Sequence, residues 1–306
     1  MSRLLVSVPT EALYQAILAS RQDVDLVVWD MTGPAPVSSL DIVVPPYMVS
    51  NAVLTQLTNV TTRLVQSQLN GYDGVAEILP AGVVYANAAG VHETSTAELT
   101  LALILAAQRG LPDFVRAAQR GQWERKFHES LADRRVLLVG YGGVGRAIEN
   151  RLLPFETTVV RLARHARSDE RGTIYGFDAL EDQLALADIV VVGVPLDEST
   201  RGLVNDGFLF AMADGALLVN IARGAVADTQ ALVEHASTGR LRLALDVTDP
   251  EPLPDGHPLF ALPNVLISPH VGGATSAMLP RMARLLNAQI DRLVRDEEPA
   301  NVVLRT

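Results

Sequence analysis

The sequence contains no cysteine. A chain without cysteine cannot form a disulfide, supply a thiolate nucleophile or build a cysteine-based metal site. Positive charge is also scarce, because 25 lysine and arginine residues face 35 acidic ones and leave a formal net charge of -10 at pH 7. This balance argues against a general binding surface for nucleic acid or for anionic membranes.

Long apolar runs are missing as well. The longest one, Leu101 to Ala107, is far too short to span a bilayer. The N-terminal segment MSRLLVSVPTEALYQ is broken by Ser7 and Pro9 and lacks the long apolar stretch of a signal peptide. We therefore expect a soluble, cytoplasmic protein with no membrane partner.

The bulk composition indicates a globular protein of more than one domain. The chain has 306 residues, of which 48% are hydrophobic and 20% charged, and this suggests two domains with a large core. Strand and helix patterns alternate in both parts of the chain. We predict an α/β fold with two Rossmann-like domains, in which a dinucleotide-binding domain (residues 96–276) is inserted into a discontinuous, flavodoxin-like substrate domain (residues 1–95 and 277–306).

Short apolar, β-branched runs predict the strands, and helical periodicity predicts the helices. The expected strands are Leu4–Val8, Leu26–Trp29, Ile42–Val44, Thr62–Gln66, Val83–Val84, Arg135–Val139, Thr158–Leu162, Asp188–Val194, Gly215–Ile221, Leu241–Val247 and Val265–Ser268. The expected helices are Glu11–Ser20, Asn51–Thr58, Thr96–Gln119 with an interruption near Gly110 and Pro112, Arg146 onward, Thr229–Thr238 and Arg281–Val294. The helix from Thr96 is apolar on most of its surface, so we expect it either to link the domains and contact a second subunit or to be an ordinary core helix.

A glycine-rich motif lies between a predicted strand and a predicted helix. Gly140, Gly142 and Gly145 form G-x-G-x-x-G. In such a motif the first glycine permits a tight turn, the second lets the backbone approach a pyrophosphate, and the third lets helix and strand pack closely. The helix N-terminus then presents N–H groups to the phosphates. We therefore predict a dinucleotide site that also includes Gly143 and Val144.

Three polar residues follow predicted strands of the same domain. Arg223 comes after GALLVNI, Glu251 after LALDV and His270 after VLIS. Loops at the carboxyl ends of parallel strands build the sites of such folds, so these side chains can converge on one crevice. An arginine can clamp a carboxylate, a histidine can exchange a proton with a forming alkoxide, and a glutamate can hold the histidine and favour its protonated form. The set suits a proton-coupled reduction of an anionic carbonyl compound.

The motifs around these residues are similar to those of a known family. NIARG at Asn220–Gly224, LDVTDPEPLP at Leu245–Pro254 and SPHVGGAT at Ser268–Thr275 resemble signatures of the D-isomer-specific 2-hydroxyacid dehydrogenases. The glycine motif, the run ADIVVVGVPL and the segment TRGLVN match in the same order. The resemblance covers nearly the whole chain, strongly from Thr96 onward and weakly before it.

The resemblance implies a role for individual residues. Arg223 would bind the carboxylate and carbonyl of the substrate, His270 would be the general acid/base, and Glu251 would be its partner. Asp246 would hold the nicotinamide carboxamide. The remaining residues implied at the cofactor are Val194, Pro195, Ile221, Ala222, Gly272 and Gly273.

The substrate loop of the family corresponds more loosely to this chain. The resemblance implies that Asn70 and Gly71 contact the substrate carboxylate, although Asn70 stands where a small or apolar residue is more usual in the family. Tyr47 and Met48 are candidates for the wall of the substrate pocket or for ordinary packing.

The choice of cofactor depends on the end of the second strand of the dinucleotide domain. NAD-specific sites place a carboxylate there, about 20 residues after the glycines, to bind the ribose 2′-hydroxyl. This chain has Ala163 at that point, followed by Arg164, His165 and Arg167. Guanidinium groups favour a 2′-phosphate. We predict that NADP(H) is preferred, with Arg164 as the main phosphate contact and Arg167 as the second, and that NAD(H) is possible.

The function predicted first is reduction of a small 2-oxoacid, such as glyoxylate or hydroxypyruvate, to the D-2-hydroxyacid by a homodimer. The alternatives are a dinucleotide-sensing protein similar to transcriptional corepressors, or an enzyme for another D-2-hydroxyacid or for phosphite. Formate dehydrogenases carry glutamine where Glu251 stands, and a phosphoglycerate dehydrogenase with a regulatory domain would extend beyond Thr306, so both are disfavoured. The histidines other than His270 lack paired ligand spacing, and no metal is expected.

Overall fold

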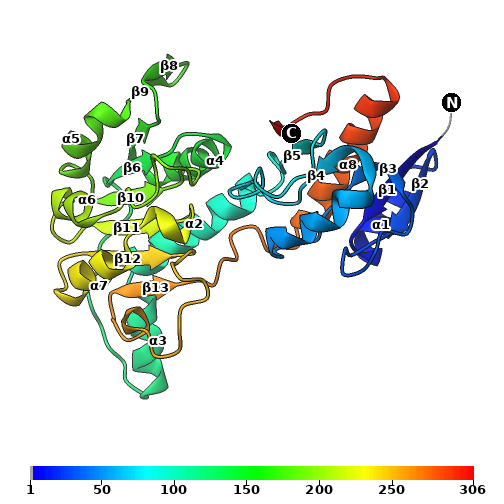
Figure 1. Cartoon of the computed structure of the whole chain (residues 1–306). Coiled ribbons are helices and arrows are strands. Elements are labelled where there is room, and N and C mark those ends of the chain that lie inside the picture. Colours follow the sequence, from blue (N-terminus) through cyan, green and yellow to red (C-terminus); the bar gives the residue numbers. More distant parts are fainter. Residues whose placement is uncertain (1–2) are drawn as a thin grey trace. The chain divides into compact units, whose positions relative to one another are not determined.

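The computed structural model describes residues 3–306 and confirms the predicted α/β class, with two Rossmann-like domains. The chain divides into two compact units. The outer unit comprises Met1–His92 and Ser276–Thr306, and the inner unit comprises Glu93–Thr275. In Figure 1 the blue and red ends of the chain therefore share one unit, while green and yellow segments form the other. In the part of the chain described, no helix combines the length and apolarity needed to cross a membrane.

The outer unit is a six-stranded sheet with helices packed on it. Its strand order is β14-β5-β4-β3-β1-β2, and every neighbouring pair is parallel except β14 and β5. The strands are β1 (Leu4–Val8), β2 (Val24–Val28), β3 (Ser39–Val43), β4 (Thr61–Gln66), β5 (Val84–Ala86) and β14 (Val302–Arg305). Helices α1 (Glu11–Leu18) and α8 (Met278–Val294) pack together, and a 3-10 helix covers Asn51–Asn59.

The inner unit is a six-stranded sheet in which every pair is parallel, in the order β13-β12-β11-β10-β6-β7. The strands are β6 (Arg135–Val139), β7 (Thr158–Leu162), β10 (Ile189–Val192), β11 (Leu217–Asn220), β12 (Arg242–Leu245) and β13 (Val265–Ile267). A parallel sheet covered on both faces buries its strands completely, which explains their near-continuous apolar sequences.

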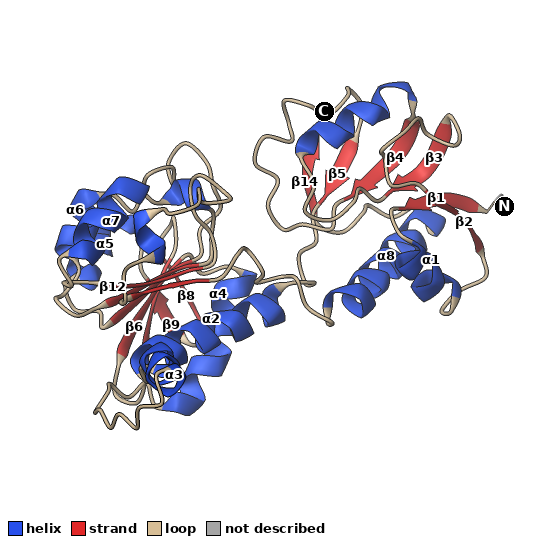
Figure 2. Ribbon diagram, turned by 90° about the horizontal axis from the view of Figure 1, so that it is seen from below, coloured by secondary structure: helices blue, strands red, loops and turns tan. Residues whose placement is uncertain are grey.

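Helices cover both faces of the inner sheet (Figure 2). Alternate strand residues point to opposite faces, so Val136 and Leu138 join one core while Leu137 and Val139 join the other. The first core contains α2 (Glu93–Gln108) and α4 (Gly143–Leu152), and the second contains α5 (Leu180–Leu184), α6 (Asp206–Ala211) and α7 (Thr229–Ser237).

The long helix expected from Thr96 is two helices. Helix α2 ends before Gly110, whose positive φ of 60° breaks the helix, and α3 (Leu111–Gln119) follows. Helix α2 buries Leu101 and Ile104 in the core of the inner unit. This burial fits the expectation of a core helix, and the expected contact with a second subunit stays a prediction.

Several short elements were not predicted from the sequence. The largest departure is a hairpin of β8 (Arg167–Asp169) and β9 (Gly172–Ile174), in a stretch for which the sequence predicted no helix or strand. Helices α5 and α6 and strand β14 were also missed, and the segment from Asn51 is a 3-10 helix. Elements this short carry too few apolar residues to show a period, so contacts with the rest of the unit decide them.

Candidate active site and cofactor-binding loops

His270 and Glu251 form a half-exposed pair at the carboxyl edge of the inner sheet. Nδ1 of His270 lies 2.5 Å from Oε1 of Glu251, and the two side chains are 27% and 39% exposed. His270 follows β13 and adopts a positive φ of 52°. Because the carboxylate accepts from Nδ1–H, it selects the tautomer and orientation of the ring and leaves Nε2 as the nitrogen that a substrate can reach.

Asp246 shapes the loop that carries His270. The Asp246 side chain is buried, and its Oδ1 accepts hydrogen bonds from Ser268 Oγ (2.6 Å) and from the amide of Val271 (2.9 Å). Its Oδ2 accepts from the amide of Gly272 at 3.0 Å, and its main-chain oxygen accepts from the amide of His270 at 2.8 Å. Four bonds thus tie the histidine loop to the end of β12. Sequence reasoning missed this role, although an aspartate directly after a buried strand was a usable signal.

Arg223 lies on the neighbouring loop, which follows β11. Buried Asn220 shapes this loop, because its side chain accepts from the amide of Ala222 (3.1 Å) and donates to the main-chain oxygen of Arg223 (3.3 Å). A Cβ on Gly224 would lie 1.8 Å from the carbonyl oxygen of Thr248. The arginine loop therefore packs directly against the segment between β12 and Glu251.

The structure thus brings Glu251 and His270 into contact and places Arg223 on an adjoining loop at the same sheet edge. The strands that precede the three loops, β11, β12 and β13, are neighbours in the sheet. Their parallel pairing puts all three carboxyl ends on one side. The three side chains come from separate segments of the sequence, and the topology of the inner unit gathers them.

Asn70 and Gly71 belong to the outer unit, where they follow β4. The main-chain oxygen of Asn70 accepts from the Asn87 side chain at 2.9 Å, whereas its Oδ1 is buried with no hydrogen-bond donor within residues 3–306. Tyr47 stacks on His92 with ring centroids 5.6 Å apart. Tyr47 thus makes a packing contact within the outer unit, and Met48 is exposed, so the role of either residue at a substrate pocket stays a prediction.

The glycine motif has the local geometry that a pyrophosphate needs. A Cβ on Gly140 would lie 2.6 Å from the backbone of Gly193, and one on Gly145 would lie 2.5 Å from the carbonyl oxygen of Gly140. These two glycines are required by packing. Gly142 is different, since a Cβ there would enter open space in front of α4, whose N-terminus has no side-chain cap. The free amides and the open approach fit an anionic group.

The other residues expected at the cofactor lie at the same edge of the sheet. Gly143 and Val144 form the first turn of α4, Val194 and Pro195 follow β10, Ile221 and Ala222 follow β11, and Gly272 and Gly273 follow His270. Gly272 is also required by packing, because a Cβ there would lie 2.9 Å from Oδ2 of Asp246.

The two arginines that follow β7, Arg164 and Arg167, differ in their partners. Arg164 donates to the carboxylate of Asp197 and, at 3.1 Å, to Ser199 Oγ. Hydrogen bonds from Ser199 and Arg164 lower the pKa of Asp197 to about 2. Arg167 instead begins β8 and donates to the main-chain oxygen of Tyr141 at 3.0 Å. Within the described residues Arg167 has no acidic partner, so its charge is the less neutralised of the two.

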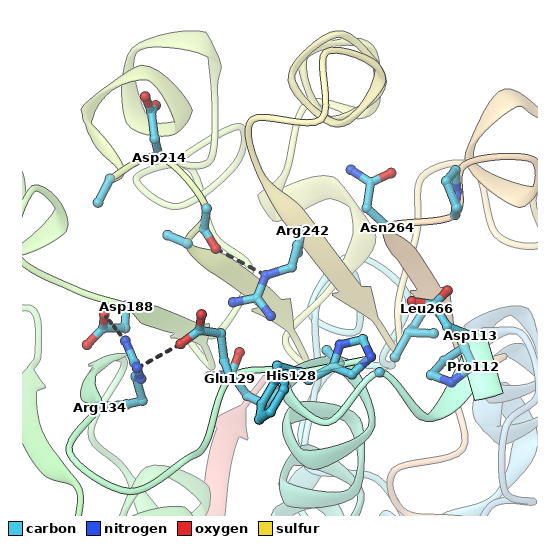
Figure 3. Close-up of a pocket in the computed structure, with 18 of the residues that line it drawn as sticks. Pro112, Asp113, His128, Glu129, Arg134, Asp188, Asp214, Arg242, Asn264 and Leu266 are labelled. Atoms are coloured by element: carbon cyan, nitrogen blue, oxygen red, sulfur yellow. Dashed lines mark hydrogen bonds and ion pairs between the residues drawn. The ribbon is translucent and has the colours of Figure 1, made fainter. Parts of the chain in front are cut away.

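A cavity of about 650 Å³ opens at the opposite, amino edge of the inner sheet (Figure 3). Arg134 lies there between Glu129 (2.7 Å) and Asp188 (3.3 Å), and the Arg242 guanidinium projects beside them. His128 lines the same cavity. None of the residues predicted for catalysis or cofactor binding belongs to its lining. This cavity therefore lies at the amino edge of the inner sheet, whereas the His270–Glu251 pair lies at its carboxyl edge.

Comparison with known proteins agrees with this geometry. Residues 101–272 match the model of the D-isomer specific 2-hydroxyacid dehydrogenase, NAD binding domain. The chain is 30% identical to a glyoxylate reductase/hydroxypyruvate reductase of Mus musculus over 90% of this chain and 89% of that protein. It is 31% identical to a glyoxylate reductase of Aeropyrum pernix, with coverage of 100% and 97%.

A solved structure shares the whole architecture. The D-isomer specific 2-hydroxyacid dehydrogenase of Xanthobacter autotrophicus Py2, in complex with NADPH and MES, superposes with a TM-score of 0.83 at 28% identity, covering 99% of this chain and 98% of that one. The family match, the whole-length relatives and the shared fold confirm the resemblance seen in the sequence. The chain belongs to the D-isomer specific 2-hydroxyacid dehydrogenases and is an NAD(P)-dependent oxidoreductase.

Proposed function

We propose that this dehydrogenase reduces a small 2-oxoacid of the glyoxylate or hydroxypyruvate type to the D-2-hydroxyacid. The observation that carries the proposal is the half-exposed His270–Glu251 pair beside the loop of Arg223. Relatives named glyoxylate reductase, similar over most of their length, support the substrate class. The D configuration follows the family.

The residues divide the reaction among them. When bound, the nicotinamide cofactor supplies a hydride to carbon 2 of the substrate. His270 donates a proton from Nε2 to the carbonyl oxygen as negative charge develops there, a contribution worth about 10² to 10⁴ in rate. Glu251 keeps the ring oriented through Nδ1 and stabilises its cationic form. The guanidinium of Arg223 clamps the substrate carboxylate with two parallel hydrogen bonds.

Two further residues are proposed to place the reactants. Asp246 already holds the histidine loop, and a carboxylate has about four acceptor positions, so an oxygen of Asp246 can also accept from the nicotinamide carboxamide. Asn70 and Gly71 are proposed to bind the substrate. The buried Oδ1 of Asn70 supports this, because an acceptor that finds no donor among residues 3–306 suits a hydroxyl or amide of a ligand.

We propose NADP(H) as the preferred cofactor, with NAD(H) accepted less well. Arg164 and Arg167 stand where an NAD-specific chain carries a carboxylate. Arg167 offers a guanidinium without an acidic partner in residues 3–306, and Arg164 uses one of its terminal nitrogens for Asp197 and Ser199, which leaves further donors for a phosphate.

The test is oxidation of NADPH and of NADH, followed by absorbance, over a panel of 2-oxoacids, with His270→Ala as the control. We expect turnover with glyoxylate or hydroxypyruvate, faster with NADPH, and none in the control. Turnover restricted to another 2-oxoacid or to phosphite would refute the substrate class. Binding of both cofactors without any turnover would favour the sensor alternative.

We also propose that the protein is a homodimer, and that its interface includes α3 and the segment that follows α3. Trp123 and Phe127, in the segment after α3, are 98% and 102% exposed, and Leu111 and Val115 on α3 are at least half exposed. Apolar side chains gathered in this way are typical of a protein–protein interface. Light scattering would show a dimer for the natural chain and a monomer for Trp123→Ser/Phe127→Ser; a monomeric natural chain would refute the proposal.

A further inference from the structure

A buried cluster of charges lies between the glycine loop and the β8–β9 hairpin, and the reaction described above does not use it. Its centre is Glu149 on α4 and Arg161 on β7, which are 4% and 5% exposed. The helical pattern of α4 would place apolar residues at such a position, and indeed Ile148 and Leu152 beside Glu149 are fully buried. A buried carboxylate and a buried guanidinium must each be fully hydrogen-bonded to be tolerated.

Glu149 accepts hydrogen bonds from two other segments of the chain. The hydroxyl of Tyr141, inside the glycine motif, donates to its Oε2, and Nη1 of Arg171, in the β8–β9 turn, donates to the same oxygen at 2.7 Å. Nε of Arg161 lies 3.7 Å from Oε1. One carboxylate thus holds the cofactor loop, the edge strand and the hairpin together.

Arg161 completes the connection to the hairpin. Its Nη1 donates to Asp169 Oδ1 at 2.9 Å, and its Nη2 donates to the main-chain oxygen of Arg171 at 2.5 Å. Its guanidinium also lies 5.4 Å from the centre of the Tyr141 ring. The hairpin also has a hydrophobic contact, because Ile174 of β9 is buried in the core of the inner unit, and the ionic contacts hold β8 and the turn against β7 and α4.

Tyr141 is held at both ends. Glu149 accepts from its hydroxyl, and Arg167, the first residue of β8, donates to its main-chain oxygen. The side chain of Arg167 can make this second bond only while the hairpin lies against the glycine loop. Glu149 therefore acts on Arg167 through two routes, the tyrosine and the hairpin turn.

We propose that Glu149 is a positioning residue for the 2′-phosphate of NADP(H): from inside the unit it holds Arg167 and the β8–β9 hairpin in the place where that phosphate binds. Glu149 does not touch the cofactor. The inference rests on the proposed preference for NADP(H). A buried ion pair is often less stabilising than an apolar pair of the same shape, and here its directional bonds determine where one particular guanidinium lies.

The test is direct binding, measured by isothermal titration calorimetry with the full chain and no substrate. Glu149→Gln keeps the shape and one acceptor oxygen, but it replaces the other oxygen by an NH2 group and removes the charge. We expect the Kd for NADPH to rise about tenfold, a size typical of coupling between residues of one network, while the Kd for NADH changes by less than about twofold. Glu181→Gln, the same change at an exposed position of α5, is the matched control and leaves both constants unaltered.

A double-mutant cycle of Glu149→Gln with Arg167→Ala distinguishes positioning of Arg167 from a general loss of stability. If Glu149 acts through Arg167, the double variant Glu149→Gln/Arg167→Ala binds NADPH no more weakly than Arg167→Ala alone. Equal losses for NADPH and NADH in Glu149→Gln, or additive losses in the cycle, would overturn the inference. If Glu149→Gln does not fold, Arg171→Met, which removes one half-exposed donor to Glu149, is expected to reduce the NADPH preference in the same direction but less.

The two proposals fail in different ways. A natural chain that binds NADH as tightly as NADPH refutes the cofactor preference, and the positioning role falls with it. A natural chain that prefers NADPH, together with a Glu149→Gln variant of unchanged preference, refutes the positioning role alone.

Discussion

Glu251 and Glu149 lie in the same unit, and their surroundings are opposite. Glu251 is 39% exposed and meets the imidazole of His270, whereas the side chain of Glu149 is 5% exposed and surrounded by a tyrosine hydroxyl and two guanidinium groups. A proton-exchanging group must reach both solvent and substrate, and the first arrangement allows this. In the second arrangement the carboxylate of Glu149 is fully engaged by Tyr141 and the two guanidinium groups, which suits a residue that positions its neighbours.

The supports of the two regions differ as well. The histidine loop is held by main-chain amides and a hydroxyl that bind the single carboxylate of Asp246. The hairpin that carries Arg167 is held by ion pairs with Arg161 and Glu149, together with the buried side chain of Ile174. Changes near His270 should therefore alter catalysis, and changes in the buried cluster should alter stability and cofactor choice.

The largest expected effect is at His270, the proposed proton donor. Replacing His270 by asparagine keeps a polar side chain of similar reach but removes the group that exchanges the proton, so kcat should fall by about 10³ with either cofactor. Calorimetric Kd values for the cofactors should stay the same. A variant that keeps a tenth of the activity would show that another group supplies the proton.

Breaking the buried pair of Glu149 and Arg161 should mainly lower the free energy of unfolding. Glu149→Leu removes one of the two carboxylates beside the buried guanidinium of Arg161 and also the acceptor of Tyr141 and Arg171, so we expect a loss of about 3 kcal/mol in the free energy of unfolding. The double variant Glu149→Leu/Arg161→Leu should recover most of it, because both charges are gone. Urea unfolding followed by circular dichroism measures both. A double variant as unstable as the single one would contradict this view of the pair.

An intermediate effect is expected where the two catalytic loops touch. In Gly224→Ala the new methyl group would overlap the carbonyl oxygen of Thr248, and the loop of Arg223 must move. A displacement of about 1 Å can reduce activity by about 10²-fold, so kcat/KM for the oxoacid should fall by 10- to 100-fold or so. Gly33→Ala, where a Cβ meets open space, is the control and should be silent. Equal activity of both variants would show that the loop contact is dispensable.

The smallest effect concerns the ion pair of Arg164. Asp197→Asn should change the thermal midpoint by no more than about 2 °C, because the pair is well exposed. The pKa of Asp197 is lowered to about 2, so its contribution is fully present above the usual aspartate range and is lost only as the pH falls toward 2. The difference between the natural chain and the variant should thus be the same at pH 8 and pH 5; a difference that shrinks across this range would place the titration higher.

Much of the inner unit could be predicted from the sequence, because local rules determine it. Buried parallel strands such as β10 and β11 appear as apolar runs, and residues that follow such strands meet at one sheet edge. That reasoning identified the loops of Arg223, Glu251 and His270. It could place Arg223 on the right edge, but it could not show that Gly224 packs on Thr248, since that contact depends on the path of the backbone.

The hairpin and its charge cluster could not be predicted in the same way. Glu149 interrupts the apolar face of α4, and only the fold shows that Arg161 and Tyr141 enclose its carboxylate. Strands of three residues, such as β8 and β9, have no period of their own. Where ionic contacts between distant segments decide the structure, hydrophobic patterning carries no information.

The interleaved order of the two units bears on how the chain folds during synthesis. Residues 93–275 are continuous, and the hydroxyls of Ser95 and Thr275, near the two ends of this stretch, lie 2.8 Å apart. The outer unit, by contrast, packs Leu13 and Ile17 of α1 in one core with Leu286 of α8, which is translated after the whole inner unit. The ribosome therefore delivers a complete inner unit while the core of the outer unit is still incomplete, and the apolar surface of β1–β5 stays uncovered until α8 and β14 emerge.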